Sequence, residues 1–266
     1  MARHGTHRGK PLLSNHQKSW LWGTVPVFET LHARCWPVYE LVMANSGESE
    51  WHQRIRALAE SQQIPLRRES ATRLTELCKA SDHQGILALL GPFPYAPLAP
   101  LLPGANAASV ILLLDRLQDA HNFGAIVRSA AAFGTRAVII GEAEQVPVNS
   151  HVARSSAGAV NHVPICRARD LASTLKDCRA AGFRILAATM QGNLSIRNVR
   201  LADRYAKAPL VLLIGNEATG IAPELIALCD DTLSIPMTGP VESLNAAVAA
   251  GILLFELIPC REAISE

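Results

Sequence analysis

The chain has 266 residues, of which 49% are hydrophobic and 18% charged, and its formal net charge is +2. This length allows two domains with a sizeable core, and glycine and proline are too few for a fibrous or wholly disordered chain. The sequence contains no apolar run of about eighteen residues and no apolar secretory core at its N-terminus, which argues against a membrane span and against secretion.

The six cysteines are scattered, and none forms a C-x-x-C pair. This spacing predicts no zinc site, and single cysteines in a chain of this size are typical of small core residues in a reducing compartment. We therefore expect a cytoplasmic protein without a bound metal.

The first part of the chain predicts a basic arm followed by a small α/β module. Residues 1–18 are polar and basic without periodicity, which favours disorder. Residues 19–91 alternate between helical and strand-like hydrophobic patterns. Helices are predicted over 25–33, 51–62 and 71–78, and strands over 38–43 and 85–90. The basic residues of the arm and the pair Arg67 and Arg68 are equally consistent with a solvated surface and with phosphate contact.

A proline-rich segment over residues 92–108 separates this module from the rest of the chain. Five prolines occur between residues 92 and 103. Because proline cannot occupy a helix interior or a central strand, the segment is predicted to be a stiff, extended linker and a domain boundary.

Residues 109–258 show short, continuous aliphatic runs that alternate with helical patterns, and residues 259–266 form a tail. The pattern predicts a parallel α/β sheet covered by helices on both faces. Strands are predicted over 110–114, 137–140, 185–188, 210–214 and 233–235, and helices over 123–132, 171–181, 222–228 and 244–257. Ligands of open α/β sheets bind beyond the carboxyl ends of the strands, so the strand-to-loop junctions are where functional residues are expected.

The first junction leads from a strand that ends at Asp115 into the helix that carries Asn122 and Arg128. Arginine on a helix otherwise rich in Ala, Ile and Val needs a partner or solvent. Taken alone, the spacing is also explained by an Asn helix cap and an Arg that reaches the surface.

The second junction places Gly215 and Glu217 directly after an aliphatic strand. Gly215 would allow a ligand to approach the backbone closely, whereas Glu217 alone is most simply a helix cap. The third junction ends a strand at Pro236, and Ser243 or Asn245 opens the next helix. That helix is apolar on every face, which predicts either a dimer contact or burial within the same chain.

Together, three motifs in this order resemble the SPOUT superfamily of RNA methyltransferases, in its TrmH-type ribose 2′-O branch. They are N-F-G-A-I-V-R at 122–128, I-G-N-E-A-T-G-I at 214–221 and I-P-M-T-G-P-V-E-S-L-N-A-A-V-A at 235–249. The resemblance covers about residues 109–258. It implies an α/β fold tied into a C-terminal trefoil knot, an exception to unknotted topology.

The N-terminal module is similar to a second known domain. Residues 21–31 and 81–88 look like the first and last segments of the ribosomal-protein-L30e-like substrate-binding domain. That domain precedes the knot in bacterial 23S rRNA guanosine 2′-O-methyltransferases and their mitochondrial relatives, whereas the tRNA-specific branch usually lacks it. The resemblance therefore implies a guanosine of large-subunit rRNA as the target.

The resemblance also implies roles for particular residues. The implied catalytic residues are Arg128, Asn122, Glu217, Ser243 and Asn245. The implied S-adenosylmethionine contacts are Gly215, Asn216, Ile235 and Leu244, with Thr189 beneath the adenosyl group. Ser129, Asn216 and the Ala246–Ala247 pair depart from the commonest family pattern, but none of them removes a side chain that the chemistry needs.

Methyl transfer to a ribose hydroxyl needs alignment and help with proton loss, but no metal. An arginine is protonated essentially always, so Arg128 is interpreted as a phosphate clamp that stabilises the developing alkoxide. The implied partners are RNA, most simply 23S rRNA or a ribosome assembly intermediate, and a second copy in a homodimer. The alternatives are a tRNA ribose methyltransferase, a non-catalytic RNA-binding relative and, more distantly, a nucleotide-dependent oxidoreductase.

Overall fold

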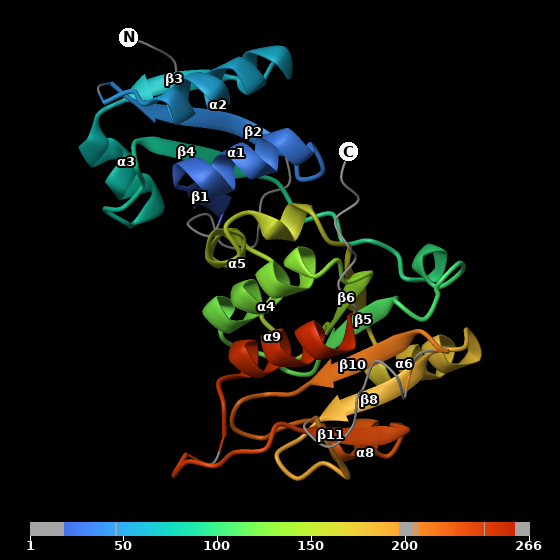
Figure 1. The fold of residues 1–266 in the computed structure, drawn as a ribbon. Helices are drawn as coiled ribbons and strands as arrows, with labels where there is room; N and C mark the ends of the chain where they lie inside the picture. The colour runs from blue at the N-terminus through green and yellow to red at the C-terminus, as the bar shows by residue number, and fades with distance from the viewer. Residues whose placement is uncertain (1–18, 46, 197–204, 206, 242, 259–266) are drawn as a thin grey trace, which may run out of the picture. The chain divides into compact units, whose positions relative to one another are not determined.

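The computed structural model describes residues 19–45, 47–196, 205, 207–241 and 243–258. The predicted arm over 1–18 and the tail over 259–266 lie outside the described residues. Contacts divide the chain into two compact units (Figure 1). The first unit holds the described residues up to Pro94 together with Val148–Asn161, and the second holds Tyr95–Pro147 and the described residues from His162 onward.

The first unit is built on a four-stranded sheet with the order β1-β4-β2-β3. The central strands β2 and β4 pair antiparallel, and β3 joins β2 in parallel. Its elements are β1 Trp20–Trp22, α1 Thr24–Ala33, β2 Val38–Ala44, α2 Glu50–Ser61, β3 Leu66–Glu69, α3 Ala71–Cys78, β4 Ile86–Leu90, α5 Ser150–Ser155 and the 3₁₀ helix η3 Ala159–Asn161. The three helices predicted here are present, whereas β1 and β3 were not expected.

The segment 148–161 was placed in the C-terminal domain by the sequence, but it clusters with the first unit. The Arg154 guanidinium lies 4.8 Å from the centre of the Trp22 ring and pairs with Asp82. Asn161 donates a hydrogen bond to Thr30 Oγ1 over 3.1 Å. A cation over an indole face and a charge-assisted pair both stabilise packing, so this segment contributes to the N-terminal unit.

The second unit is a seven-stranded sheet with the order β7-β6-β5-β10-β8-β11-β9, and every pairing in it is parallel. Its strands are β5 Val110–Leu114, β6 Ala137–Gly141, β7 Ile165–Ala168, β8 Arg184–Ala188, β9 Leu194–Ser195, β10 Leu210–Ile214 and β11 Asp231–Ser234. Its helices are η2 Ala99–Leu101, α4 Ala120–Ala132, α6 Leu171–Ala180, α8 Pro223–Ile226 and α9 Ala246–Leu257. The α/β class and the parallel sheet predicted from the sequence are confirmed.

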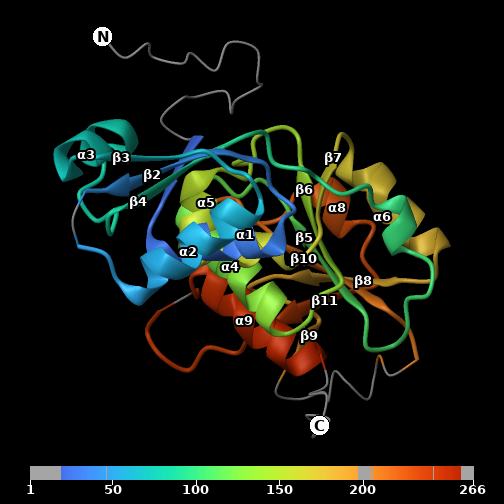
Figure 2. The same ribbon diagram turned by 90° about the horizontal axis from the view of Figure 1, so that it is seen from above.

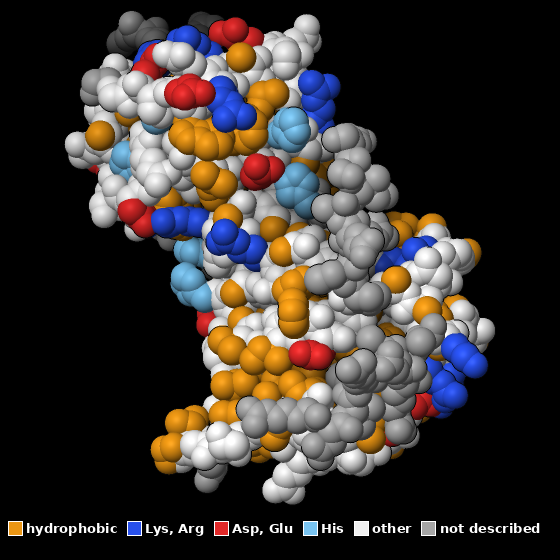
Figure 3. Space-filling model, in the orientation of Figure 1, with side chains coloured by type: hydrophobic (Ala, Val, Ile, Leu, Met, Phe, Trp, Pro, Cys, Tyr) orange, Lys and Arg blue, Asp and Glu red, His pale blue; other side chains and the backbone are white. Residues whose placement is uncertain are grey.

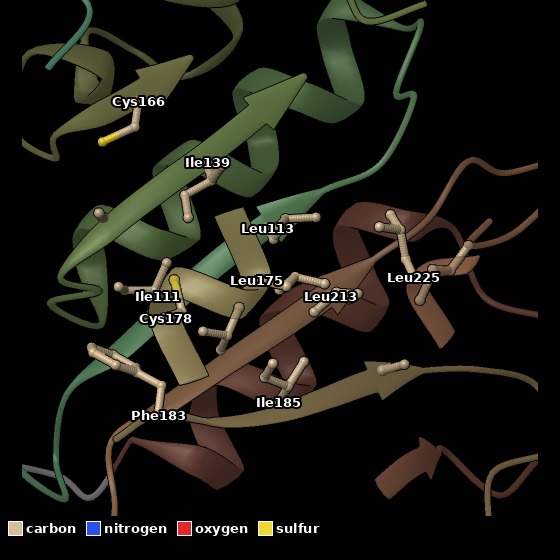
Figure 4. Close-up of a cluster of buried hydrophobic side chains, with 14 of the residues drawn as sticks. Ile111, Leu113, Ile139, Cys166, Leu175, Cys178, Phe183, Ile185, Leu213 and Leu225 are labelled. Carbon is tan, nitrogen blue, oxygen red and sulfur yellow. The ribbon is translucent and has the colours of Figure 1, made fainter. Parts of the chain in front are cut away.

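Helices cover both faces of this sheet, with α6 and α8 on one side and α4 and α9 on the other (Figure 2). The central strands β5 and β10 are buried at all five positions, as expected for strands that contribute side chains to two cores. One core, shown in Figure 4, packs Ile111 and Leu213 against Leu175 of α6 and Leu225 of α8.

The proline-rich segment is not extended throughout its length. It contains η2, and Leu98, Leu101 and Leu102 pack against the core of the second unit. Arg136 donates hydrogen bonds to the carbonyl oxygens of Leu101 and Pro103, at 2.5 and 2.7 Å. Apolar residues between the prolines therefore bind the segment to the second unit.

Of the five cysteines in the described residues, three are buried as predicted and Cys229 is partly buried. Cys78, Cys166 and Cys178 are buried, and burial raises the pKa of Cys166 and Cys178 to about 11. Cys35 is instead exposed. Within the part of the chain that the structure describes, no helix is long and apolar enough to cross a bilayer.

Candidate active site

Two helix N-termini bring the predicted site residues of the second unit together. Asp119 caps α4 by accepting the backbone N–H of His121 at 2.9 Å. Asn122 therefore lies in the first turn of α4, and its amide is not used as the cap. Asn245 caps α9, and its Oδ1 accepts the backbone N–H groups of Ala247 and Val248 at 2.9 and 3.4 Å. Of the two predicted openers of this last helix, Asn245 is thus the cap.

Three of the predicted catalytic residues form one chain of hydrogen bonds. Asn122 Nδ2 donates to Glu217 Oε1 over 2.6 Å, and Asn245 Nδ2 donates to Asn122 Oδ1 over 2.9 Å. A carboxylate can only accept, and the cap fixes Asn245 Oδ1 as an acceptor. Both amides therefore have one orientation, and each keeps a second N–H for a bound molecule. We call this arrangement the Glu217–Asn122–Asn245 chain.

The Glu217–Asn122–Asn245 chain lies where α4 and α9 run side by side and parallel (Figure 1). Further along the pair, a Cβ at Gly251 would lie 3.6 Å from Ser129 Oγ, and the rings of Phe133 and Phe255 are 6.1 Å apart. Both helices thus point their positive ends toward Glu217. This field stabilises a carboxylate, and would equally stabilise the phosphate of a bound nucleotide.

The turn that carries Glu217 is held by Asn216. Asn216 Oδ1 accepts the backbone N–H groups of Ala218 and Thr219 at 2.8 and 3.1 Å, and its Nδ2 donates to the carbonyl oxygen of Arg116 at 2.8 Å. The side chain predicted to contact the cofactor is therefore engaged in shaping the turn. These contacts position Glu217, and a cofactor contact of Asn216 stays a prediction.

The turn itself also requires a glycine at position 215. A Cβ at this position would lie 2.4 Å from the backbone of Gly220 and Ile221. The close approach that glycine permits here is thus made by the chain's own turn.

A buried carboxylate, to which the sequence analysis gave no role, anchors the same turn. Asp115, at the end of β5, is only 2% exposed and accepts the backbone N–H of Ala222 at 2.8 Å. Arg116 donates two hydrogen bonds to the same carboxylate, both 3.1 Å long, and these bonds raise the pKa of Arg116. An acidic residue that directly follows five buried aliphatic residues could have signalled this role.

Arg128 and Ser243 are not part of the Glu217–Asn122–Asn245 chain. Both are exposed, and neither makes a hydrogen bond or ion pair with the described residues. Six residues at about 100° each separate Arg128 from Asn122, which places the two about 120° apart around α4. The guanidinium thus remains available for a partner outside the described chain.

The residues predicted to hold the cofactor lie at one edge of the sheet. Thr189, Gly215 and Ile235 follow the carboxyl ends of the neighbouring strands β8, β10 and β11. The Thr189 hydroxyl is buried and has no hydrogen-bond partner among the described residues. Buried polar groups are normally satisfied, so this hydroxyl fits a ligand at the edge. No cluster of His, Cys, Asp and Glu side chains suited to a metal ion occurs in the described ranges.

Comparison with known proteins gives the family. Residues 109–255 match the SpoU rRNA Methylase family. The chain belongs to this family. It is 32% identical over 255 residues to "Putative TrmH family tRNA/rRNA methyltransferase YacO" of Bacillus subtilis (strain 168), covering 95% of this chain and 100% of that protein. The SPOUT resemblance of the sequence is thereby confirmed, and the protein is a methyltransferase of the SpoU/TrmH family.

Solved structures extend the likeness beyond the matched region. The SpoU methyltransferase AviRb from Streptomyces viridochromogenes, solved with AdoMet, has a TM-score of 0.74 at 26% identity, covering 90% of this chain and 88% of AviRb. An AdoMet-bound rRNA methyltransferase from Sinorhizobium meliloti has a TM-score of 0.75 at 26% identity, covering 90% and 85%. Since both cover 90% of this chain, the likeness includes most of the N-terminal unit.

Proposed function

We propose that this protein transfers a methyl group from S-adenosylmethionine to a ribose 2′-hydroxyl of RNA, at a guanosine of large-subunit rRNA. The observation that carries the proposal is the Glu217–Asn122–Asn245 chain. It joins residues far apart in the sequence at two helix N-termini, beside a sheet edge that can hold a cofactor. Family membership supports methyl transfer to RNA.

S-adenosylmethionine would be held at the sheet edge of Thr189, Gly215 and Ile235, with Asn216 and Leu244 as further predicted contacts. Two structural relatives are crystallised with this cofactor, which supports the assignment. When bound, it supplies an electrophilic methyl group. The unpartnered Thr189 hydroxyl fits a hydrogen bond to such a ligand. Thr189→Val should therefore leave the melting temperature unchanged or raise it, while S-adenosylmethionine affinity falls about fivefold or more.

The side chains that surround the reacting hydroxyl divide the remaining work. Asn122, Ser243 and Asn245 orient the nucleotide by hydrogen bonds, while Glu217 holds the amide of Asn122 and the helix cap holds that of Asn245. Arg128 clamps a phosphate and stabilises the developing alkoxide. The proton leaves to a phosphate oxygen or to water, because a guanidinium cannot accept it.

We also propose that the protein acts as a homodimer through α9. Val248 and Phe255 are about two helical turns apart, on the same face of α9, and are 51% and 58% exposed. Apolar residues so exposed on one helix face favour a second copy as its cover. Arg128, which faces away from Asn122, would then serve either RNA on its own side of α4 or the site of the second copy. Mixing inactive Arg128→Ala with inactive Asn122→Ala restores activity only in the second case.

The N-terminal unit favours rRNA over tRNA as the substrate, because the sequence resemblance links such a module to the rRNA enzymes. The trefoil knot and a cytoplasmic location belong to the same proposal. The knot is predicted by the family resemblance, and the location by the scattered, unpaired cysteines. A tRNA ribose remains the alternative substrate, and the experiment below separates the two.

Methyl transfer from labelled S-adenosylmethionine tests the substrate and the position together. Unmodified large-subunit rRNA and unmodified tRNA are incubated with the full-length protein in separate reactions. We expect label in rRNA, within an alkali-resistant dinucleotide, because 2′-O-methylation blocks alkaline cleavage. Label on a base would refute the ribose assignment, and label in tRNA alone would refute the rRNA assignment.

A further inference from the structure

A cluster of aromatic and cationic side chains lies on α1 and α2 of the first unit. It consists of Phe28 and His32 of α1 and Trp51 and Arg54 of α2, and we call it the Arg54 platform. The Phe28 and His32 rings stack 5.6 Å apart at 9°, and the Phe28 and Trp51 rings meet edge to face at 5.2 Å. The Arg54 guanidinium carbon lies 4.5 Å from the centre of the Phe28 ring and 4.7 Å from that of Trp51.

The platform is accessible. His32 and Arg54 are exposed, and Phe28 and Trp51 are half-buried. In Figure 3, hydrophobic side chains lie beside Lys or Arg and His side chains on the surface over α1 and α2. Trp51 differs in this from the other tryptophans, Trp20, Trp22 and Trp36, which are 3%, 4% and 2% exposed.

The charge of Arg54 is not neutralised within the described residues, since it forms no ion pair there. Among the other described arginines of the first unit, Arg34 at the C-terminal end of α1 also forms no ion pair, whereas the rest are neutralised, Arg56 by Glu48. Arg67 pairs with Glu40 and Glu69, Arg68 with Glu48, Arg73 with Glu76, and Arg154 with Asp82. The basic pair Arg67 and Arg68, which the sequence left open as a phosphate contact, is thus engaged by carboxylates. Of the two arginines left without an ion pair in the described part of this unit, Arg54 is the one that lies over aromatic rings.

A purely structural explanation accounts for only part of this arrangement. An arginine stem can cover aromatic rings while its head reaches water. An arginine that only covers rings needs neither the His32 ring stacked on Phe28 nor a guanidinium without a carboxylate partner. Aromatic rings beside an unpaired guanidinium are the combination that binds unpaired nucleotides, where a base stacks on the rings and the cation contacts phosphate.

We propose that the Arg54 platform stacks an unpaired base of the RNA substrate, with Arg54 contacting a phosphate beside it. This inference rests on the proposed function only in that the substrate is RNA. The stacked base belongs to a nucleotide other than the methylated one, because Phe28, Trp51 and Arg54 are not among the residues that we assign to the reacting ribose. The platform therefore contributes to RNA affinity and not to the chemical step.

The experiment uses the full-length protein and an unmodified transcript of large-subunit rRNA. Arg54→Ala should weaken transcript binding about tenfold, because it removes both the phosphate contact and the cation that lies over the Phe28 and Trp51 rings. The slope of log affinity against log salt should fall by about one if Arg54 neutralises one phosphate. Turnover at saturating RNA and S-adenosylmethionine affinity should stay within twofold of wild type. Arg73→Ala, which removes an arginine paired with Glu76 on α3, is the matched control and should bind normally.

Trp51 supplies an independent readout, because the other three indoles are buried. Binding of the transcript should quench Trp51 emission and protect it from acrylamide, and Trp51→Phe should abolish that change. Arg54 is exposed, so Arg54→Ala stays informative even if a Trp51 variant folds poorly. The proposal is overturned if Arg54→Ala binds the transcript as Arg73→Ala does, or if wild-type protein binds it without a change in Trp51 emission. Absence of methyl transfer by the wild type would refute the proposed function instead.

Discussion

Exchanging the amide and the carboxylate between positions 122 and 217 tests the Glu217–Asn122–Asn245 chain directly. Asn122→Asp places two acceptors where a donor and an acceptor now lie 2.6 Å apart. The double variant Asn122→Asp/Glu217→Gln restores a donor, because the new amide at 217 can donate to the new carboxylate at 122. The double variant has the same total charge as the wild type, because one carboxylate and one amide change places. The second hydrogen bond is also kept, since Asn245 can still donate to position 122 in every variant.

The structure sets the size of the expected effect. A hydrogen bond to a charged group contributes about 1.5–3 kcal/mol. Two carboxylates that relax to about 4 Å apart repel by about 1 kcal/mol in water and by about 4 kcal/mol near a protein surface. Because Glu217 is exposed, the lower end applies to the repulsion, and Asn122→Asp should cost about 2–4 kcal/mol. Glu217→Gln keeps the acceptor and should cost about 1 kcal/mol or less.

Denaturant unfolding of the wild type, both single variants and the double variant measures the coupling at one pH and salt concentration. We expect the double variant to recover at least about 1.5 kcal/mol relative to the sum of the singles. Additivity within about 0.5 kcal/mol, the range for residues that do not interact, would refute the hydrogen bond. Turnover is measured on the same four proteins. Recovery of stability without recovery of turnover would assign a catalytic role to the negative charge at position 217 itself.

Three further predictions concern residues outside this chain. Arg128→Ala should leave cofactor affinity and melting temperature unchanged and lower turnover at least about a hundredfold, with little recovery in Arg128→Lys; near-normal turnover would exclude the catalytic role. Gly158→Ala should destabilise the protein by about 1–3 kcal/mol more than Gly134→Ala in thermal unfolding, because both have positive φ but only at Gly158 would the new Cβ lie 2.5 Å from Glu29; equal losses would contradict this. A guanidinium hydrogen bond lowers the pKa of Asp82, so its stabilising effect should be present at neutral pH and lost as the pH falls through the lowered pKa, and the stability difference from Asp82→Asn should vanish in acid.

The core of the second unit could be predicted because its strands are continuous aliphatic runs. Val110–Leu114 and Leu210–Ile214 were predicted with the bounds that the structure has. Both strands are buried on two faces, so tertiary context and local composition agree. The same agreement holds for helix Ala71–Cys78, which has Ser70 as its cap.

The elements that were missed lack such a pattern. Trp20–Trp22 has only three residues, and Leu66–Glu69 has the sequence LRRE. The second of these is a strand because its backbone pairs with β2, while its arginines are held by carboxylates on other elements. Pairing with a distant strand leaves no local periodicity, so a single sequence cannot reveal it. The helix Ser150–Ser155 was missed because its six residues are too few to show a helical period.

Three of the five predicted catalytic residues lie together, but the sequence could not reveal the hydrogen bonds that join them. Asn122 is 95 residues from Glu217 and 123 residues from Asn245, and only the fold places these side chains in hydrogen-bond contact. The contact between Asp115 and the turn after β10 also depends on the order of the strands, which the sequence did not reveal. This order brings the end of β10 beside the end of β5, where Asp115 holds the turn that follows β10.

The pairing of arginines explains why composition gave no sign of an RNA-binding protein. A formal charge of +2 counts every guanidinium equally, but a guanidinium paired with a carboxylate of its own fold has little charge left for phosphate. Arg67, Arg68 and Arg154 are paired in this way. Arg54 in the first unit and Arg128 in the second have no ion-pair partner among the described residues. Other described arginines, among them Arg34 and Arg169, also lack an ion pair. Affinity for a polyanion depends on this unpaired subset, in which we assign Arg54 to RNA binding and Arg128 to the reacting ribose, although the whole chain is nearly neutral.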